Sequence, residues 1–189
     1  MIFELVGEEM NRKIRILSVI CICWFMFSMT VYANSRKEMD FISVGLSNDE
    51  SVLLPKGARE SSGMDGSSRG DYISSSYLNI SNKGYGEIGI LAMTLAHKPV
   101  KKIRMNVYLD RWDEEKETWF QVDYYYFTYE YKEGEEDLTE VTEDFSVLGL
   151  PTGCYYRLRS FNAVFPFEGG VESQGPVTDG ILITDGPAV

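Results

Sequence analysis

The feature that most constrains the fold is a two-residue alternation in KKIRMNVYLDRW, residues 101–112. Successive side chains of a β-strand point to opposite faces, so this pattern predicts a strand with one buried face. The apolar set expected to face the core is Ile103, Met105, Val107 and Leu109. The set expected to face solvent is Lys102, Arg104, Asn106, Tyr108 and Asp110.

Other segments after residue 71 also have the composition of strands. Residues 87–97 form a short apolar run, and residues 118–131, TWFQVDYYYFTYEY, are rich in aromatic and β-branched side chains. Polar turns separate these segments, and none of them has a convincing helical period. We therefore predict an all-β domain over residues 71–189, with the architecture of an antiparallel β-sandwich of the immunoglobulin or fibronectin III-like kind.

The first 33 residues have the three parts of a signal peptide. A basic stretch at residues 12–15 precedes 18 uncharged residues, 16–33, which end in Val-Tyr-Ala. We predict a helical signal peptide over residues 1–33 that is cut between Ala33 and Asn34, and a secreted, extracellular product. Translation is expected to begin at Met10, because two glutamates just before it fit a signal peptide badly. The alternative is an uncleaved leader that anchors the chain in a membrane, since a spanning helix needs about 20 apolar residues.

Residues 34–70 are poor in apolar side chains and rich in Ser, Gly and charge. Such a segment buries too little surface to offset its conformational entropy. We predict a mostly disordered linker, and allow a short ordered piece at Phe41–Val44 or at Val52–Leu54.

The charge balance narrows the range of partners. The chain has 29 acidic and 18 basic residues, a net charge of −11. This argues against nucleic acid, whose phosphates need a basic face, and against binding to anionic lipid. Contact with a membrane is expected only through the leader, during export.

The residues needed for catalysis are sparse. His97 is the one histidine and is expected in a solvent-exposed turn, and Cys154 is the one cysteine after the leader. No phosphate-binding loop follows a strand into a helix. We therefore predict a protein that is not an enzyme and has no cofactor and no metal site. The acidic stretches at 113–117 and 133–144 are interpreted as solvated turns; calcium binding there, or a carboxylate-dependent glycoside hydrolase, are the alternatives.

The aromatic run at 118–131 is the strongest pointer to a binding surface. Only one face of a sandwich strand joins the core, so some of its tyrosines should lie outside. Exposed aromatic rings can stack on sugars or anchor a protein interface, although cross-strand pairs of tyrosines also stabilise a sheet that has no ligand. We predict binding of a glycan or a protein at the cell surface through Tyr108, Trp112, Tyr125 and Tyr129.

The segment LPTGCYYRL, residues 150–158, resembles the start of a strand in fibronectin type III and related sandwiches. In those proteins a leucine precedes by six residues a tyrosine whose hydroxyl bonds back to the backbone. The spacing from Leu150 to Tyr156 matches. The resemblance, which covers residues 150–160, implies that Tyr156 points inward and that Arg157 and Arg159 lie in solvent.

The order of segments also resembles a wider family. SRGDYIS, a Gly turn, EIGILAMTL, a VYLDRW–TWFQV hairpin and YYRLRSF follow one another over residues 68–184. This order is similar to that of small secreted proteins of clostridial-type Gram-positive bacteria, which are classed as a domain of unknown function. The resemblance implies a signal peptide and a compact β domain, and brings no catalytic residues. Residues 133–144 depart from it by their length and charge.

Overall fold

The computed structural model describes residues 51–66 and 70–188, which belong to one unit, Leu46–Val189. Every regular element in this part is a strand, so the prediction of an all-β domain is confirmed. The strands are β1 (Glu60–Asp65), β2 (Ile73–Gly84), β3 (Glu87–Ala96), β4 (Lys102–Asp113), β5 (Thr118–Glu130), β6 (Glu140–Val147), β7 (Tyr155–Phe165), β8 (Glu172–Gln174) and β9 (Ile181–Leu182).

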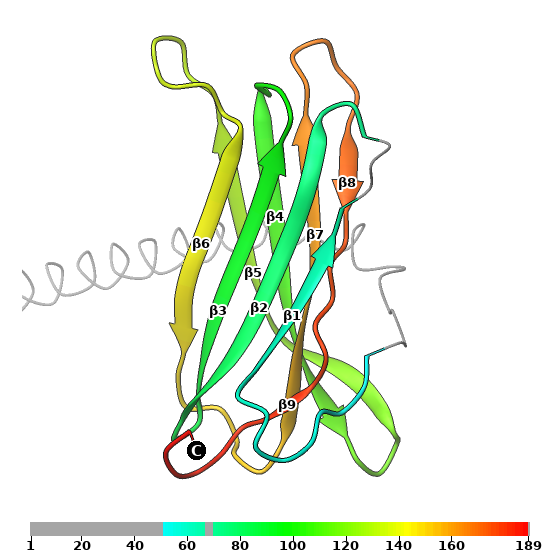
Figure 1. Cartoon of the computed structure of the whole chain (residues 1–189), viewed down its shortest axis with the longest axis vertical. Helices are drawn as coiled ribbons and strands as arrows, with labels where there is room; N and C mark the ends of the chain where they lie inside the picture. The colour runs from blue at the N-terminus through cyan, green and yellow to red at the C-terminus, as the bar shows by residue number, and fades with distance from the viewer. Residues whose placement is uncertain (1–50, 67–69, 189) are drawn as a thin grey trace, which may run out of the picture. The chain divides into compact units, whose positions relative to one another are not determined.

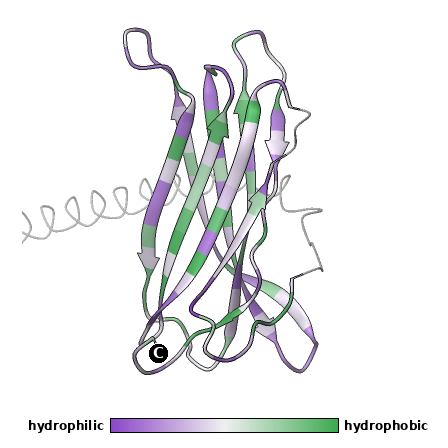
Figure 2. Cartoon of the chain, viewed as in Figure 1, coloured by the Kyte–Doolittle hydropathy of each residue, from purple (hydrophilic) through white to green (hydrophobic). Residues whose placement is uncertain are grey.

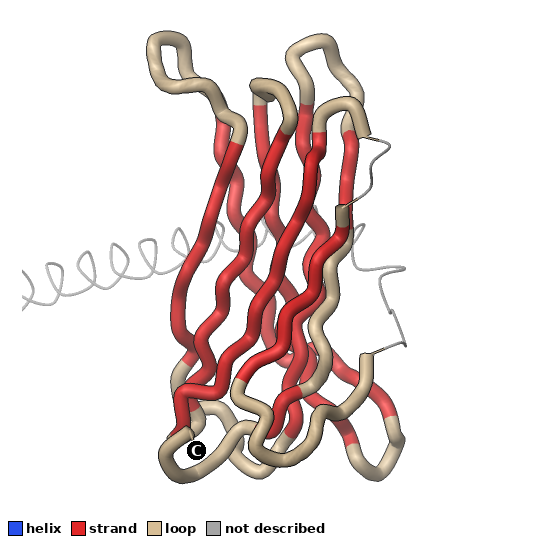
Figure 3. Tube along the Cα trace, viewed as in Figure 1, coloured by secondary structure: helices blue, strands red, loops and turns tan. Residues whose placement is uncertain are grey.

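The strands form two antiparallel sheets that lie face to face (Figures 1 and 3). One sheet has the order β1-β2-β3-β6, and the other has the order β5-β4-β7-β8, with β9 also paired to β7. All pairings between these strands are antiparallel, as expected for an antiparallel sandwich. In the described residues no helix is long and apolar enough to cross a bilayer. The predicted leader (1–33), the start at Met10 and the cut between Ala33 and Asn34 lie outside the described residues.

Alternating side chains of both sheets make the core. All four apolar positions of the alternation in β4 are completely buried, as predicted. Figure 2 shows the resulting pattern of hydrophobic and polar bands along the strands. The larger core cluster includes Leu78, Ile90, Leu109 and Leu158, and a smaller one includes Ile73, Ile103 and Val164.

A layer of buried polar side chains separates these two clusters along the strands. Ser76 and Thr94 face each other on β2 and β3, and Asn162 and Gln174 face each other on β7 and β8. All four are buried, together with Ser160. Within the described part of the chain, the side-chain polar atoms of these five residues have no hydrogen-bond partner. Burial of a polar group that makes no hydrogen bond is destabilising.

Replacing Thr94 by valine is therefore expected to raise the free energy of unfolding by about 1 kcal/mol, since the shape is kept and a buried hydroxyl is removed. Urea unfolding followed by circular dichroism measures the change. Thr142→Val on the exposed face of β6 is the control and should change little. A loss of stability in Thr94→Val would contradict this reading of the layer.

The predicted linker, residues 34–70, differs from the structure in its second half. Strand β1 pairs with β2 along its whole length, so the domain includes residues before 71. The prediction weighed apolar content, whereas β1 is held by backbone hydrogen bonds, and its small side chains permit close packing. A Cβ on Gly63 would meet the carbonyl oxygen of Val177 at 2.0 Å. Leu53 also bridges to Gly180, so the allowed ordered piece at Val52–Leu54 is present, and Phe41–Val44 lies outside the described residues.

The start of β7 has the geometry expected from its motif. The hydroxyl of Tyr156 donates to the carbonyl oxygen of Pro151 at 3.0 Å, and Tyr156 is completely buried. Leu158 and Ser160, which alternate with the two arginines, are also buried. The prediction that Arg157 and Arg159 lie in solvent is wrong, because both contact the buried carboxylate of Asp110 on the outer face of the sheet.

Candidate functional site

The β4–β5 hairpin carries all the residues that were predicted to bind a ligand. Leu109 pairs with Asp123 and Asp110 pairs with Gln121, so Val122 is an extra residue in β5. Beyond this bulge the register places Tyr125 and Tyr129 opposite Val107 and Ile103. These partners are core residues, so the register assigns both tyrosines to the inner face.

Tyr125 and Tyr129 are half-buried against the core and are not the exposed pair that the sequence predicted. The ring of Tyr125 meets Phe145 edge-on at 4.8 Å, and its hydroxyl donates to Asp123 Oδ2 at 2.9 Å. Burial and the Asp123 carboxylate both raise the pKa of Tyr125. These contacts make Tyr125 a packing residue.

Tyr108 lies on the outer face, as predicted, but it is covered. Its side chain is 7% exposed, and the guanidinium of Arg159 lies over its ring at 5.1 Å. Burial raises the pKa of Tyr108. The expectation that Tyr108 offers an open ring to a ligand is therefore wrong.

The exposed tyrosines of β5 are the neighbouring pair, Tyr124 and Tyr126, each 45% exposed. They stand opposite Tyr108 and Asn106 on the outer face. The guanidinium of Arg104 lies 6.0 Å from the Tyr126 ring. The sequence predicted the strand and the existence of an outer set of tyrosines, but Tyr125 and Tyr129 do not belong to that outer set.

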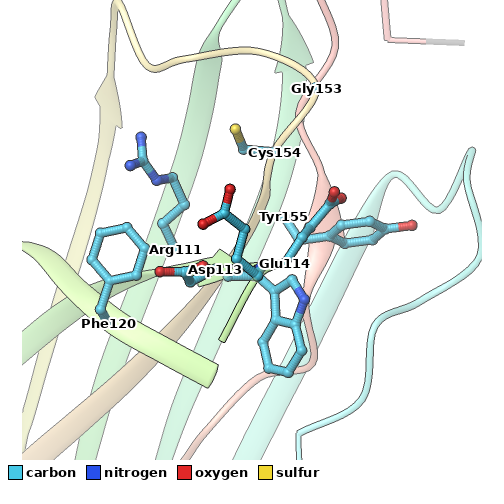
Figure 4. A pocket seen from close by; sticks show the side chains of 9 residues that line it. Arg111, Asp113, Glu114, Phe120, Gly153, Cys154 and Tyr155 are labelled. Atoms are coloured by element: carbon cyan, nitrogen blue, oxygen red, sulfur yellow. Dashed lines mark hydrogen bonds between the residues drawn. The ribbon is translucent and has the colours of Figure 1, made fainter. Parts of the chain in front are cut away.

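Trp112 is the predicted residue that does line a pocket. It lies at the end of the hairpin, where its ring meets Trp119 edge-on at 5.2 Å. The pocket has a volume of about 400 Å³. Its lining is Arg111, Trp112, Asp113, Glu114, Glu115, Phe120, Gly153, Cys154 and Tyr155. Figure 4 shows Arg111 and Phe120 on one side of it and Tyr155 on the opposite side.

The hairpin turn fixes the charged groups of the pocket. Asp113 Oδ1 accepts hydrogen bonds from the backbone N–H groups of Glu115 and Lys116, at 3.1 and 3.2 Å. The Lys116 ammonium lies 3.1 Å from Asp113 Oδ2. Its hydrogen bond to Asp113 is the main cause that lowers the pKa of this carboxyl. Asp113 is therefore an ionised acceptor at neutral pH.

The pocket joins aromatic faces to groups that bond hydroxyls. Trp112, Phe120 and Tyr155 line it, with Trp112 and Tyr155 on the outer face of the sheet and Phe120 on the inner face. The Arg111 guanidinium lies over the Phe120 ring at 4.8 Å. Carboxylates accept hydrogen bonds and a guanidinium donates them in a fixed fork. An open cavity with apolar faces and a few polar groups is typical of a small-ligand site.

Arg111, Phe120 and Tyr155 were not predicted from the sequence as members of this site. Arg111 and Phe120 are paired across the β4–β5 hairpin. The turn at 113–117 was therefore the sequence feature from which their proximity could have been predicted. Tyr155 belongs to β7, which follows the β6–β7 connection, and no local pattern places that connection beside the hairpin. The thiol of Cys154 is half-buried at the pocket and lies 3.7 Å from the carbonyl oxygen of Thr152.

The other residue considered for catalysis is His97. His97 is exposed in the turn between β3 and β4. Across residues 51–66 and 70–188, no three His, Cys, Asp or Glu side chains gather in a group that could hold a metal ion.

No protein-family model matches the chain, and no curated protein matches it.

Proposed function

We propose that this chain is an exported, non-catalytic β-sandwich protein that binds a sugar unit of an extracellular glycan in the pocket at the end of the β4–β5 hairpin. The observation that carries the proposal is the grouping of Trp112, Phe120 and Tyr155 with Arg111 and Asp113 around about 400 Å³ of open space. The apolar face of a sugar ring can stack on aromatic rings, while its hydroxyls bond to the charged groups.

The proposal also includes export from the cell and a fibronectin III-like type of sandwich. The signal-peptide pattern before Asn34 supports export, and an uncleaved leader would display the same pocket at a membrane surface. The chain passes from one sheet to the other after β3, β5 and β6. These Greek-key connections and the Tyr156 corner support a fibronectin III-like sandwich. Membership of the family of small secreted proteins is proposed from the order of the sequence segments.

A carboxylate-dependent glycoside hydrolase would use the acids of the same pocket. Such an enzyme needs one carboxyl group that is protonated at the working pH. The hydrogen bond from Lys116 lowers the pKa of Asp113, which makes it a poor proton donor. Binding without turnover is therefore the function that we propose.

Replacing Trp112 by alanine is expected to weaken glycan binding about tenfold, since loss of a central aromatic anchor removes 1–2 kcal/mol or more. A glycan array, followed by calorimetry with the strongest ligand, measures the change. Glu114→Gln, which alters an exposed carboxylate of the lining, should also weaken binding.

Phe167→Ala is the matched control. Phe167 is 51% exposed in the β7–β8 loop, at the opposite end of the sheet, and its replacement should leave binding unchanged. Equal binding by the Trp112→Ala variant, or release of chromophore from aryl glycosides by the unaltered chain, would contradict the proposal.

A further inference from the structure

The two lateral edges of the sandwich differ in how their outermost strands are bonded. On one side, the segment that leads from β8 to β9 is bonded to the region around β1. Leu54 N–H donates to Gly180 O at 2.9 Å, and Asp179 N–H donates to Ser61 Oγ at 2.9 Å. On the other side, within the described residues, β5 pairs only with β4 and β6 pairs only with β3. This second side therefore has two free strand edges.

The register shows which backbone groups of β5 face away from β4. Tyr131 N–H donates to Lys101 O at 2.9 Å, so residues 101 and 131 form a hydrogen-bonded pair. In an antiparallel ladder such pairs alternate with pairs whose N–H and C=O groups point outward. The outward groups of β5 beyond its bulge are those of Tyr124, Tyr126, Thr128 and Glu130. The Tyr124 N–H already donates to Asp123 Oδ1 at 2.8 Å. All four residues are exposed, so the N–H groups of Tyr126, Thr128 and Glu130 are the accessible donors, beside the outward carbonyl groups.

β5 has one of the usual protections against edge pairing, the bulge at Val122, and lacks the others. Natural edge strands are short or bulged, or carry lysine, proline or several charges. β5 is 13 residues long, has no proline, lysine or arginine, and has two acids, Asp123 and the terminal Glu130. β6, on the same side, carries Glu140, Glu143 and Asp144 within eight residues. The edge of β5 is the better template for an added strand.

Both ends of β5 are acidic. The turn at 113–117 and the loop at 131–137 each hold four carboxylates and one lysine. Lys116 pairs with Asp113 at 3.1 Å, and Lys132 pairs with Glu135 at 3.6 Å, so each end keeps a negative balance. A strand of this length spans about 40 Å. That is several Debye lengths at about 0.1 M salt, so each end acts on its own.

The acidic ends of β5 restrict which chains could pair with its free edge. A second copy that pairs antiparallel would place its 131–137 loop beside the 113–117 turn, and like charges would repel. A parallel copy would set each acidic end beside its equivalent. We propose that the free edge of β5 accepts an extended segment of another protein, with basic residues at both ends and β-branched residues between them. Strand addition of this kind takes its affinity from main-chain hydrogen bonds. The proposal does not require the hairpin pocket to bind a glycan.

The test uses the full chain and fluorescent peptides with the sequence KKTVTVTVTVKK. Fluorescence anisotropy should show binding that weakens at least tenfold between 50 and 300 mM NaCl. A peptide with glutamates in place of the four lysines should bind at least tenfold more weakly at 50 mM NaCl. The lysine peptide with N-methyl groups on alternate residues should also lose binding. Equal binding of the lysine and glutamate peptides, or no binding of either, would overturn the proposal.

Variants of the edge locate the site. Tyr126→Pro removes an outward N–H without removing a bond to β4, and is expected to weaken binding at least tenfold. Thr128→Lys adds a positive charge at the edge and should weaken it similarly, while Thr142→Lys on β6 is the matched control. If Tyr126→Pro disturbs the fold, the affinity of the Thr128→Lys variant tests the proposal instead. Equal affinities of the two lysine variants would contradict the proposal, as would a dimer in sedimentation experiments that Tyr126→Pro or Thr128→Lys dissociates.

Discussion

Replacing Asp110 by asparagine is expected to lower the free energy of unfolding by about 3 kcal/mol. Asp110 is 1% exposed, and its carboxylate binds two arginines. Arg157 Nε lies 3.0 Å from Asp110 Oδ2, and Arg159 Nε and Nη2 lie 2.6 and 3.0 Å from Oδ2 and Oδ1. The amide keeps one acceptor but removes the negative charge between two cations. Equilibrium unfolding in guanidinium chloride measures the loss, which is a large fraction of a typical domain stability of about 5–15 kcal/mol.

Two comparisons isolate the charge as the cause. Asp144→Asn, on the exposed face of β6, removes the same charge in water and should change stability by less than about 0.5 kcal/mol. Replacing Asp110 by leucine together with both arginines by methionine should cost less than Asp110→Asn alone, because no buried charge remains. A loss in Asp110→Asn as small as in Asp144→Asn would contradict this account.

The alternation in β4 predicted which way side chains point, but not whether they are covered. Asp110 and Tyr108 do face outward from the core, yet both are buried. The cause is a second layer on the outer face. The Trp119 ring lies 4.7 Å from the Arg157 guanidinium and reaches the far strand edge, where a Cβ on Gly180 would meet it at 2.5 Å. No pattern within one strand encodes this contact between residues 61 positions apart.

The prediction of which tyrosines of β5 face outward was wrong, again because the answer depends on contacts outside the strand. Both faces of residues 118–131 are aromatic, so hydrophobicity alone could not assign the core side. The assignment depends on the register with β4 and on the extra residue at Val122. Register follows from long-range pairing, and a shift of one residue exchanges the faces. By contrast, the corner at Tyr156 rests on a local spacing, and the sequence predicted its hydrogen bond correctly.

Replacing Glu172 by glutamine is expected to lower the free energy of unfolding by about 2 kcal/mol at pH 7, because hydrogen bonds to a charged group are strong and partial exposure weakens them only in part. The carboxylate of Glu172 accepts the backbone N–H groups of Asp71, Tyr72 and Ile73, at 3.0, 3.0 and 2.9 Å. It thereby ties the start of β2 to the start of β8. Glutamine keeps one acceptor and loses the charge that strengthens all three bonds. Urea unfolding at pH 7 measures the change.

The effect should depend on pH, with a sign set by the pKa of Glu172. Burial raises this pKa, but the three N–H donors together outweigh burial, and the folded value lies below the ordinary 4.5. A depressed folded pKa gives stability that is complete above about pH 5 and is lost as the pH falls through the folded pKa. The difference between the original chain and Glu172→Gln should therefore shrink as the pH falls below about 4.5. Glu60→Gln, at the exposed start of β1, is the matched control and should change stability little at pH 7. An equal loss at pH 7 and pH 3 would mean that the geometry of the side chain, and not its charge, holds these strands together.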